Sequence, residues 1–174
     1  MKGEPADEKT RRIHGIKTKR LLLRTLTRAD AAAVRNVSGG EFKTEKDARK
    51  YIRWVHTVNR KPLFVFYIWL AQTGRCIGRV YIHSKPELGG EVEIGYGIAE
   101  EHRCNGYATE AARAAVRFAF EQAGLESLCA IVKPENIASL RVINKLGFTH
   151  CGVRTVLDEN GVNCAFEYFK LYNS

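Results

Sequence analysis

Two β-rich runs separated by a short turn constrain the fold of this chain most. The run FVFYIWLAQ at 64–72 is followed by Thr73-Gly74 and then by RCIGRVYIH at 75–83. Such β-branched and aromatic residues favour strands, and the turn between them predicts an antiparallel hairpin. A third β-rich run, EVEIGYGIA, follows at 91–99 after a loop containing glycine and proline. We therefore expect an antiparallel sheet at the centre of the chain.

Helical patterns occur in the sequence both before and after these strands. Thr27 with Asp30, and Thr44 with Asp47, have the spacing of a capping box, which marks the start of a helix. Further along the chain, Gly124 and Gly147 stand where a glycine commonly ends a helix. The predicted helices cover residues 28–36, 45–59, 106–123 and 136–146.

The remaining runs complete a single domain. Strands are expected at 20–26 and 127–133, and two more should flank the turn at 158–161. The fold class is therefore α/β (α+β), with a mixed, largely antiparallel central sheet of about seven strands flanked by about four helices. Residues 1–12 carry charges of both signs without an apolar core, which predicts a disordered tail ahead of one domain at 13–174.

Composition narrows the class of protein. The formal net charge of +9 favours an anionic partner such as nucleic acid, a ribosomal surface or a phosphate-rich cofactor, although a solvated basic surface explains it equally well. The five cysteines are odd in number and contain no C-x-x-C pair, so we expect reduced thiols and no metal site. No apolar run approaches the ~20 residues of a membrane helix, and no secretory leader is evident. The expected location is the cytoplasm.

The run EVEIGYGIA has one face that is nearly bare of side chains. Strand alternation places Glu93, Gly95 and Gly97 on that face. Glycines within a strand often mark the close approach of a ligand or another backbone, and Glu93 beside a ligand channel could act as a general base. The alternative is that Glu93 belongs to a structural ion pair and the glycines mark a bulge.

The stretch RCNGYAT at 103–109 opens an Ala-rich helix. The unpaired N–H groups at the start of a helix, its dipole and Arg103 together suit a phosphate or pyrophosphate, and Gly106 lets that group approach the backbone. The alternative is an ordinary turn glycine before a helix. Further on, Asn136 stands at the N-cap of the last helix and Ser139 lies one turn in, where capping alone would explain Asn136.

In their order and spacing, EVEIGY, RCNGYATEA, PENIAS and KLGF resemble the GNAT superfamily of acetyl-CoA-dependent N-acetyltransferases. The similarity extends from about Thr18 to the C-terminus. It is strongest to the Rim-type branch, which acetylates the N-termini of ribosomal proteins and has relatives that act on other amines. The resemblance implies an acetyl-CoA co-substrate and an amine acceptor, either a protein N-terminus or a small molecule.

The resemblance also assigns residues to the co-substrate. Backbone groups near Ile98 are implied to bind the pantetheine arm, while Asn136 and Ser139 are implied to lie near the thioester. Arg103 and the backbone amides of the following residues are implied to hold the pyrophosphate. Those residues are Cys104, Asn105, Gly106, Tyr107, Ala108 and Thr109.

In this family a neutral amine attacks the thioester directly, without an acyl-enzyme. Glu93 is the candidate base. Many members carry a tyrosine acid in the last helix where this chain has Ile143, which leaves Ser139 or solvent to protonate the departing thiolate.

Three other positions depart from the branch. Cys104 replaces a usual glycine, Asn105 replaces a usual lysine or arginine, and Gly97 replaces a bulky aromatic residue. The glycine at position 97 would open the acceptor channel. Cys129 and Cys164 lie on predicted strands, where we expect buried, unreactive thiols rather than nucleophiles.

Other functions remain open at this point. A module of the same fold could bind CoA without turnover, as the missing tyrosine and the basic charge would allow. A basic RNA-binding domain is a further class, but no RNP-like sequence supports it, so neither direct nucleic-acid binding nor membrane association is expected. A homodimer is left open.

Overall fold

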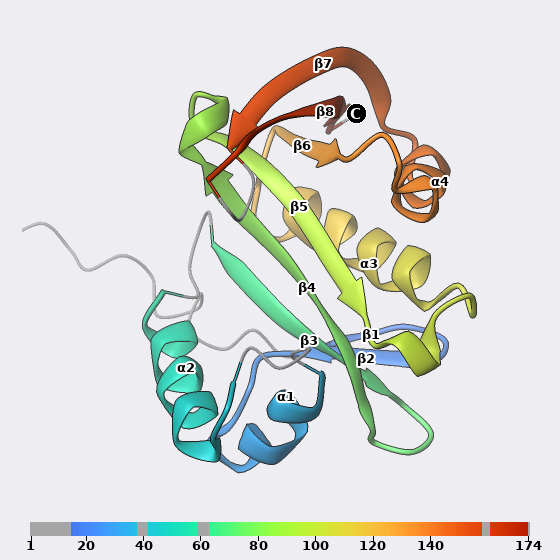
Figure 1. Cartoon of the computed structure of the whole chain (residues 1–174). Coiled ribbons are helices and arrows are strands. Elements are labelled where there is room, and N and C mark those ends of the chain that lie inside the picture. The colour runs from blue at the N-terminus through green and yellow to red at the C-terminus, as the bar shows by residue number, and fades with distance from the viewer. Residues whose placement is uncertain (1–14, 38–41, 59–62, 158–160, 174) are drawn as a thin grey trace, which may run out of the picture.

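The computed structural model describes residues 15–37, 42–58, 63–157 and 161–173. Within them the chain forms one eight-stranded sheet in the order β1-β2-β3-β4-β5-β6-β8-β7 (Figure 1). Neighbouring strands are antiparallel except β5 and β6, which are parallel. The structure therefore has the mixed, largely antiparallel architecture that the sequence predicts.

The elements lie close to the predicted ones. The strands are β1 (Ile16–Lys17), β2 (Leu21–Arg24), β3 (Phe64–Leu70), β4 (Cys76–Lys85), β5 (Glu91–Ile98), β6 (Ser127–Val132), β7 (Thr149–Leu157) and β8 (Asn163–Tyr172). The helices are α1 (Ala31–Val37), α2 (Glu45–Val58), α3 (Tyr107–Glu121) and α4 (Ile137–Lys145). Short 3-10 turns lie at Arg28–Asp30, Pro86–Leu88 and Glu100–His102. The additional strand is β1, whose two residues are too few to show a strand pattern in the sequence.

Some predictions concern parts of the chain that the structure does not describe. The expected tail at 1–12 and most of the turn at 158–161 lie outside the described residues. The domain limits stay a prediction.

The sheet is covered by helices on both faces (Figure 1). Strand β3 is buried throughout its first six residues, and its alternate side chains enter two separate cores. Phe64, Phe66 and Ile68 pack in the core that includes α3, whereas Tyr67 and Trp69 pack in the core that includes α1 and α2. The small side chains of α3 let it lie close to the sheet, as predicted, and four of them are fully buried: Ala111, Ala112, Ala115 and Ala119.

Neither a membrane-spanning helix nor a metal-binding cluster is found among the described residues. None of their helices is long and apolar enough to cross a membrane. No cluster of three or more His, Cys, Asp or Glu side chains gathers among them in a way that could hold a metal ion.

Both predicted capping boxes are present. Asp30 Oδ2 accepts hydrogen bonds from the Thr27 N–H and Oγ1 at 2.6 and 2.8 Å. Arg24 adds two donors to the same carboxylate, at 2.7 and 2.9 Å. The box of Thr44 and Asp47 is exposed instead. The sequence predicted both boxes, but the ion pair that buries the first was not predicted.

We expect Asp30→Asn to lower the free energy of unfolding at pH 7 by about 2 kcal/mol, because Arg24 loses its carboxylate partner in a largely buried site. Burial acts to raise the pKa of Asp30, but the hydrogen bonds from Arg24 and Thr27 outweigh it and hold the pKa below its ordinary value. Such a carboxylate stabilises the fold above its unfolded pKa of about 3.9 and loses that effect as pH falls through its folded pKa. The difference between the two proteins should therefore shrink below about pH 4.

Urea unfolding at pH 7 and pH 3 measures this difference. Asp47→Asn is the matched control, since it makes the same change in the exposed box and should alter stability much less. Equal losses in the two variants at pH 7 would contradict the role given to Arg24.

Candidate active site

Strands β5 and β6 touch at one point and then diverge (Figure 1). Strand β5 pairs with β4 along its whole length, but with β6 only at Glu93 and Cys129. The Ala99 N–H donates to the Ile77 carbonyl at 2.8 Å, so alternation along the antiparallel ladder turns the N–H and C=O of Tyr96 and Ile98 away from β4. The divergence therefore leaves these backbone groups without a strand partner.

The loop after β5 leads into the N-terminus of α3. Gly106 is the N-cap residue and has φ of 77°, in the left-handed region that favours glycine. The first intrahelical hydrogen bond there runs from the Glu110 N–H to the Gly106 carbonyl, at 3.1 Å. The N–H groups of Tyr107, Ala108 and Thr109 precede it and have no partner within the helix. The predicted cluster of unpaired backbone donors is thus present at the start of α3.

Cys104 has φ of 61° and is the single described non-glycine residue with a positive φ. The position at which the resembling family usually has glycine is therefore one where the backbone requires a left-handed conformation. The left-handed conformation costs a residue with a Cβ about 1–2 kcal/mol. The departure at Cys104 is consequently a strained one.

We expect Cys104→Gly to raise the free energy of unfolding by about 0.5–1 kcal/mol, because the relief of strain exceeds the larger entropy that glycine loses on folding. Thermal denaturation should show a melting temperature higher by about 1–3 °C for a chain of this size. Cys151→Gly is the control, since Cys151 is also exposed but its φ is not left-handed, and this variant should be no more stable than the parent. A lower melting temperature for Cys104→Gly would contradict the strain.

The side chain of Asn105 forms hydrogen bonds within the loop. Its Nδ2 donates to the carbonyls of His102 and Arg103 at 3.3 and 2.8 Å. The Asn105 carbonyl accepts from Arg20 Nη1 at 3.0 Å. Asn105 therefore contributes to the shape of the loop, and Arg20 brings to it a positive charge that Asn105 lacks.

Arg20 was missed by sequence reasoning, because it comes from β1–β2, far from the loop in sequence. Its guanidinium lies 4.6 Å from the centroid of the Tyr107 ring, and its Nε donates to Glu110 Oε2 at 2.7 Å. Glu110 also accepts from the Thr18 hydroxyl at 2.6 Å. These contacts join the N-terminal strands to the first turn of α3.

Arg103 lies at the same end of β5. Its Nε donates to the Ile98 carbonyl at 3.1 Å. Arg103 therefore occupies the carbonyl of Ile98, one of the two backbone groups of that residue that we expect to bind a ligand. The Arg103 guanidinium has four further N–H donors.

A basic cavity of about 540 Å³ lies beside the N-terminus of α3. Gly106 and Thr109 line it together with cationic side chains from β1–β2, α3 and α4. Glu110 is the acidic residue of its lining. The cationic residues are Lys17, Lys19, Arg20, Arg113, Arg117 and Lys145.

Asn136 and Ser139 lie across the divergence from β5. Asn136 Oδ1 accepts from the Ser139 N–H at 3.1 Å, so Asn136 caps α4 as the structural alternative predicted. Ser139 Oγ lies 3.0 Å from the hydroxyl of Tyr96. Burial raises the pKa of Tyr96 in spite of the opposing hydrogen bond to Ser139, so its hydroxyl stays protonated at neutral pH.

Tyr96 is a further residue that sequence reasoning missed, because nothing in its local sequence indicates a chemical role. Ile143, at the position where many resembling proteins carry a tyrosine, is 1% exposed and packs in the core with α3. The hydroxyl groups at this end of α4 therefore come from Ser139 and Tyr96.

Glu93 is buried on the opposite face of β5, with 6% of its surface exposed. Its Oε2 lies 3.0 Å from His83 Nε2 and 3.3 Å from Lys85 Nζ. The carboxylate thus belongs to an ion-pair cluster at the point where β5 and β6 separate. Neither His83 nor Lys85 was singled out in the sequence, because both lie on β4 and meet Glu93 only through strand register.

The two glycines of this strand differ. A Cβ at Gly95 would lie 2.2 Å from Cζ of Tyr81, so the Tyr81 ring fills that space and the predicted ligand or backbone approach is wrong there. A Cβ at Gly97 would have no atom within 4 Å. The β4–β5 ladder has no register shift, so the glycines do not mark a bulge. The open position on this face is Gly97.

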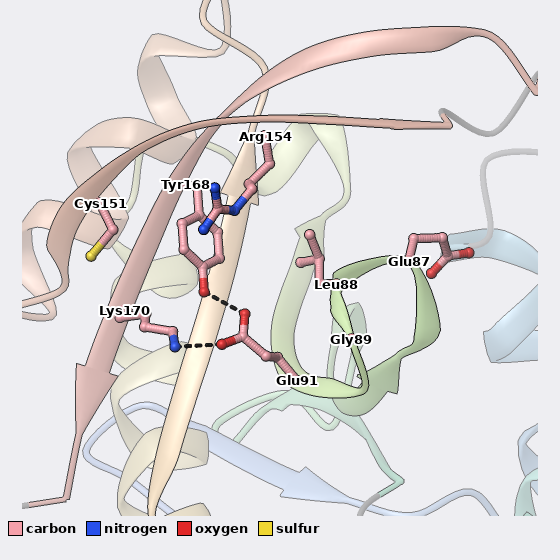
Figure 2. Close-up of a pocket in the computed structure, with 8 residues that line it drawn as sticks. All are labelled: Glu87, Leu88, Gly89, Glu91, Cys151, Arg154, Tyr168 and Lys170. Carbon is pink, nitrogen blue, oxygen red and sulfur yellow. Dashed lines mark hydrogen bonds and ion pairs between the residues drawn. The ribbon is translucent and has the colours of Figure 1, made fainter.

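A larger cavity of about 660 Å³ lies farther along the face that carries Glu93 (Figure 2). Glu91 accepts a hydrogen bond from the Tyr168 hydroxyl and pairs with Lys170. Burial acts to raise the pKa of Glu91, but Lys170 and Tyr168 outweigh it and hold the pKa below its ordinary value. Arg154 lies over the Tyr168 ring, 4.8 Å from its centroid, and Glu87 adds a second carboxylate to the lining.

The cysteines near this face differ in exposure. Cys129 pairs with Glu93 in register and is 1% exposed. Burial raises its pKa to about 12, so it is the unreactive thiol that the sequence predicts. Cys164 lies on β8 and is partly buried.

Comparisons with known proteins point to one family. A profile of the acetyltransferase (GNAT) domain matches residues 20–149. YoaA of Bacillus subtilis, named as an N-acetyltransferase, is 30% identical over 158 residues, which cover 84% of this chain and 89% of YoaA. YkkB of the same organism is 34% identical over 110 residues, and this match spans 61% of the chain and 63% of YkkB, slightly less than two thirds of its length.

Solved structures share the fold. A ribosomal-protein-S5-alanine acetyltransferase from Vibrio fischeri superposes with a TM-score of 0.76 over 92% of this chain and 97% of that protein, at 18% identity. RimL, a ribosomal L7/L12 α-N-protein acetyltransferase solved in complex with coenzyme A, gives a TM-score of 0.75 over 91% of this chain and 98% of RimL, at 14% identity. At these identities the likeness concerns the fold.

Proposed function

This chain belongs to the GNAT acetyltransferase family, and on that premise we propose that it transfers the acetyl group of acetyl-CoA to a primary amine. The acceptor is a protein N-terminal amine or a small-molecule amine. The observation that carries the proposal is the position of the loop Arg103 to Thr109, which leads into the unpaired backbone donors of α3, at the open end of the diverging strands β5 and β6.

The phosphates of acetyl-CoA suit this loop. The free N–H groups of Tyr107, Ala108 and Thr109 and the positive end of the α3 dipole supply donors to an anion. Arg103 and Arg20 add two guanidinium groups beside them, and the adjoining cavity is lined by cations. In our proposal Cys104, Asn105 and Gly106 give the loop the shape that brings these donors together.

The pantetheine arm would lie along β5. The N–H of Ile98 and both backbone groups of Tyr96 point away from β4 and offer the hydrogen-bond partners that an extended amide chain requires. Asn136 and Ser139 approach from α4 on the other side. The thioester would then lie near the point where β5 and β6 meet.

Acetyl-CoA supplies the thioester carbonyl, which the acceptor nitrogen attacks so that a C–N bond forms and the C–S bond breaks, without an acyl-enzyme. The chain has to take a proton from the acceptor ammonium and supply one to the departing thiolate. Glu93 and the cluster around it carry the first task in our proposal. Ser139 Oγ, hydrogen-bonded to the protonated Tyr96 hydroxyl, carries the second in place of the missing tyrosine at Ile143.

The acceptor would enter over the face that bears Glu93. The cavity of Figure 2 lies on that face, and Gly97 leaves it open farther along β5. The cavity contains both carboxylates and cations, so it suits a polar acceptor.

The test is an assay of free thiol release from acetyl-CoA by the purified chain. The acceptor panel comprises peptides beginning with serine or alanine, spermidine and an aminoglycoside. Thiol release above the rate without acceptor, together with an acetylated amine detected by mass spectrometry, is the expected result. Binding of CoA without any such release would favour instead a CoA-binding module, which is the alternative that the buried Ile143 suggests.

A further inference from the structure

A cluster of titratable groups surrounds Glu93. His83 and Glu93 are register partners on β4 and β5, and Glu93 is at the same time the last residue of β5 that pairs with β6. The cluster therefore lies at the point where β5 and β6 separate, called the apex below, on the face from which an acceptor would approach. Glu91, two residues earlier on the same face, lines the cavity of Figure 2.

Glu93 is poorly placed to meet an acceptor by itself. Its side chain is 8% exposed, whereas that of His83 is 32% exposed. Its Oε2 is already within reach of two donors, His83 Nε2 and Lys85 Nζ, which compete with an incoming ammonium for the carboxylate. Histidine is also the side chain that most often transfers protons as a general acid or base in enzymes.

We propose that His83 is the catalytic base of the acetyl transfer and that Glu93 is its positioning residue. This inference rests on the proposed function. It moves the proton-accepting atom from the buried carboxylate to the imidazole that is hydrogen-bonded to it.

The hydrogen bond defines which nitrogen takes the proton. An ionised carboxylate only accepts hydrogen bonds, so Nε2 of His83 carries the hydrogen that is donated to Glu93. Nδ1 is then the nitrogen with a free lone pair. The acceptor ammonium gives its proton to Nδ1, the neutral amine attacks the thioester, and the imidazolium is stabilised by Glu93 until it releases the proton to water at its exposed edge.

Other charged and titratable groups act on the same imidazole. Lys85 on β4 opposes a positive charge on His83, and its contact with Glu93 weakens the carboxylate's effect. Tyr81, also on β4, packs edge-on against the imidazole with ring centroids 5.2 Å apart. From β5, Glu93 is the group that favours the imidazolium.

The test compares His83→Gln with the parent in thiol release, using the panel amine with the highest rate, from pH 5.5 to 9.5. His150→Gln is the matched control, because His150 also pairs with a glutamate, Glu167 at 2.5 Å, but on β7 and β8 away from the apex. We expect kcat/KM at pH 7 to fall about 100-fold in His83→Gln and to be unchanged in the control. The loss should diminish at high pH, where the amine is already neutral.

Two further measurements separate chemistry from structure. Acetyl-CoA affinity and melting temperature should match the parent in His83→Gln, and added imidazole should restore part of the rate of His83→Ala. Nitrogen NMR of the parent at pH 8 should show the His83 hydrogen on Nε2.

The proposal has clear contrary results. The proposal would be overturned if kcat/KM of His83→Gln had the same pH dependence as the parent, or if NMR showed the His83 hydrogen on Nδ1. If the fall of kcat/KM at low pH disappeared in Glu93→Gln but not in His83→Gln, the role of base would return to Glu93. If the parent releases no thiol with any amine, the proposed function itself fails. In that case, the position of the His83 hydrogen in the NMR spectrum would still test whether Nε2 donates to Glu93.

Discussion

Gly78→Ala should lower the free energy of unfolding by about 3 kcal/mol or more, the largest loss of stability that we expect from one added methyl group. Gly78 lies on β4, between β3 and β5. A Cβ there would lie 2.2 Å from the Gly97 carbonyl oxygen and 3.1 Å from Cα of Ile98. Both atoms belong to the backbone of β5, so the strand itself would have to move, and overpacking of this kind in a closed site is costly.

The same substitution on the facing strand is the control. A Cβ at Gly97 meets nothing within 4 Å, so Gly97→Ala should change the free energy of unfolding much less. Urea unfolding of the two variants measures the difference. Equal stability of the two would contradict the close approach of β4 and β5. Because β5 bears Ile98 and leads to Arg103, Gly78→Ala should also weaken acetyl-CoA binding.

Arg103→Glu should weaken acetyl-CoA binding by roughly ten- to hundredfold, which corresponds to about 1.4–2.7 kcal/mol. The substitution removes a guanidinium from the loop that precedes α3 and puts a carboxylate where we expect a pyrophosphate. It also removes the hydrogen bond to the Ile98 carbonyl. The KM for the amine should change less than the affinity for acetyl-CoA.

Isothermal titration calorimetry with acetyl-CoA tests this expectation. Arg49→Glu is the control, because it makes the same change in net charge on α2, where Arg49 pairs with Glu45. Equal weakening in the two variants would attribute the effect to overall charge. Equal effects of Arg103→Glu on acetyl-CoA and on the amine would count against the pyrophosphate assignment.

Local sequence patterns predicted most of the fold because they act over a few residues. The capping boxes at Thr27 and Thr44 and the β-rich runs around Thr73-Gly74 each specify one element without reference to the rest. The helix after Gly106 and its N-terminal donors follow from the same local logic. For this reason the loop from Arg103 to Thr109 could be proposed as an anion site from the sequence.

Contacts between distant residues could not be predicted in this way. Arg20 reaches Asn105 and Glu110 because β2 lies beside α3, and Tyr96 reaches Ser139 because α4 lies across from β5. The space at Gly95 is filled by Tyr81 through strand register. None of these pairs has a sequence spacing that indicates contact.

The sequence by itself determined the succession of strands and helices, the backbone donors at the start of α3 and the face on which Glu93 lies, since each depends on local periodicity and capping. The tertiary structure alone decided what surrounds those groups. Register between β4 and β5 puts His83 and Lys85 on Glu93, and the left-handed backbone at Cys104 shows why a glycine suits that position. The physical reason is that a side chain's partners are set by which strands and helices pack together, and that packing joins residues far apart in the chain.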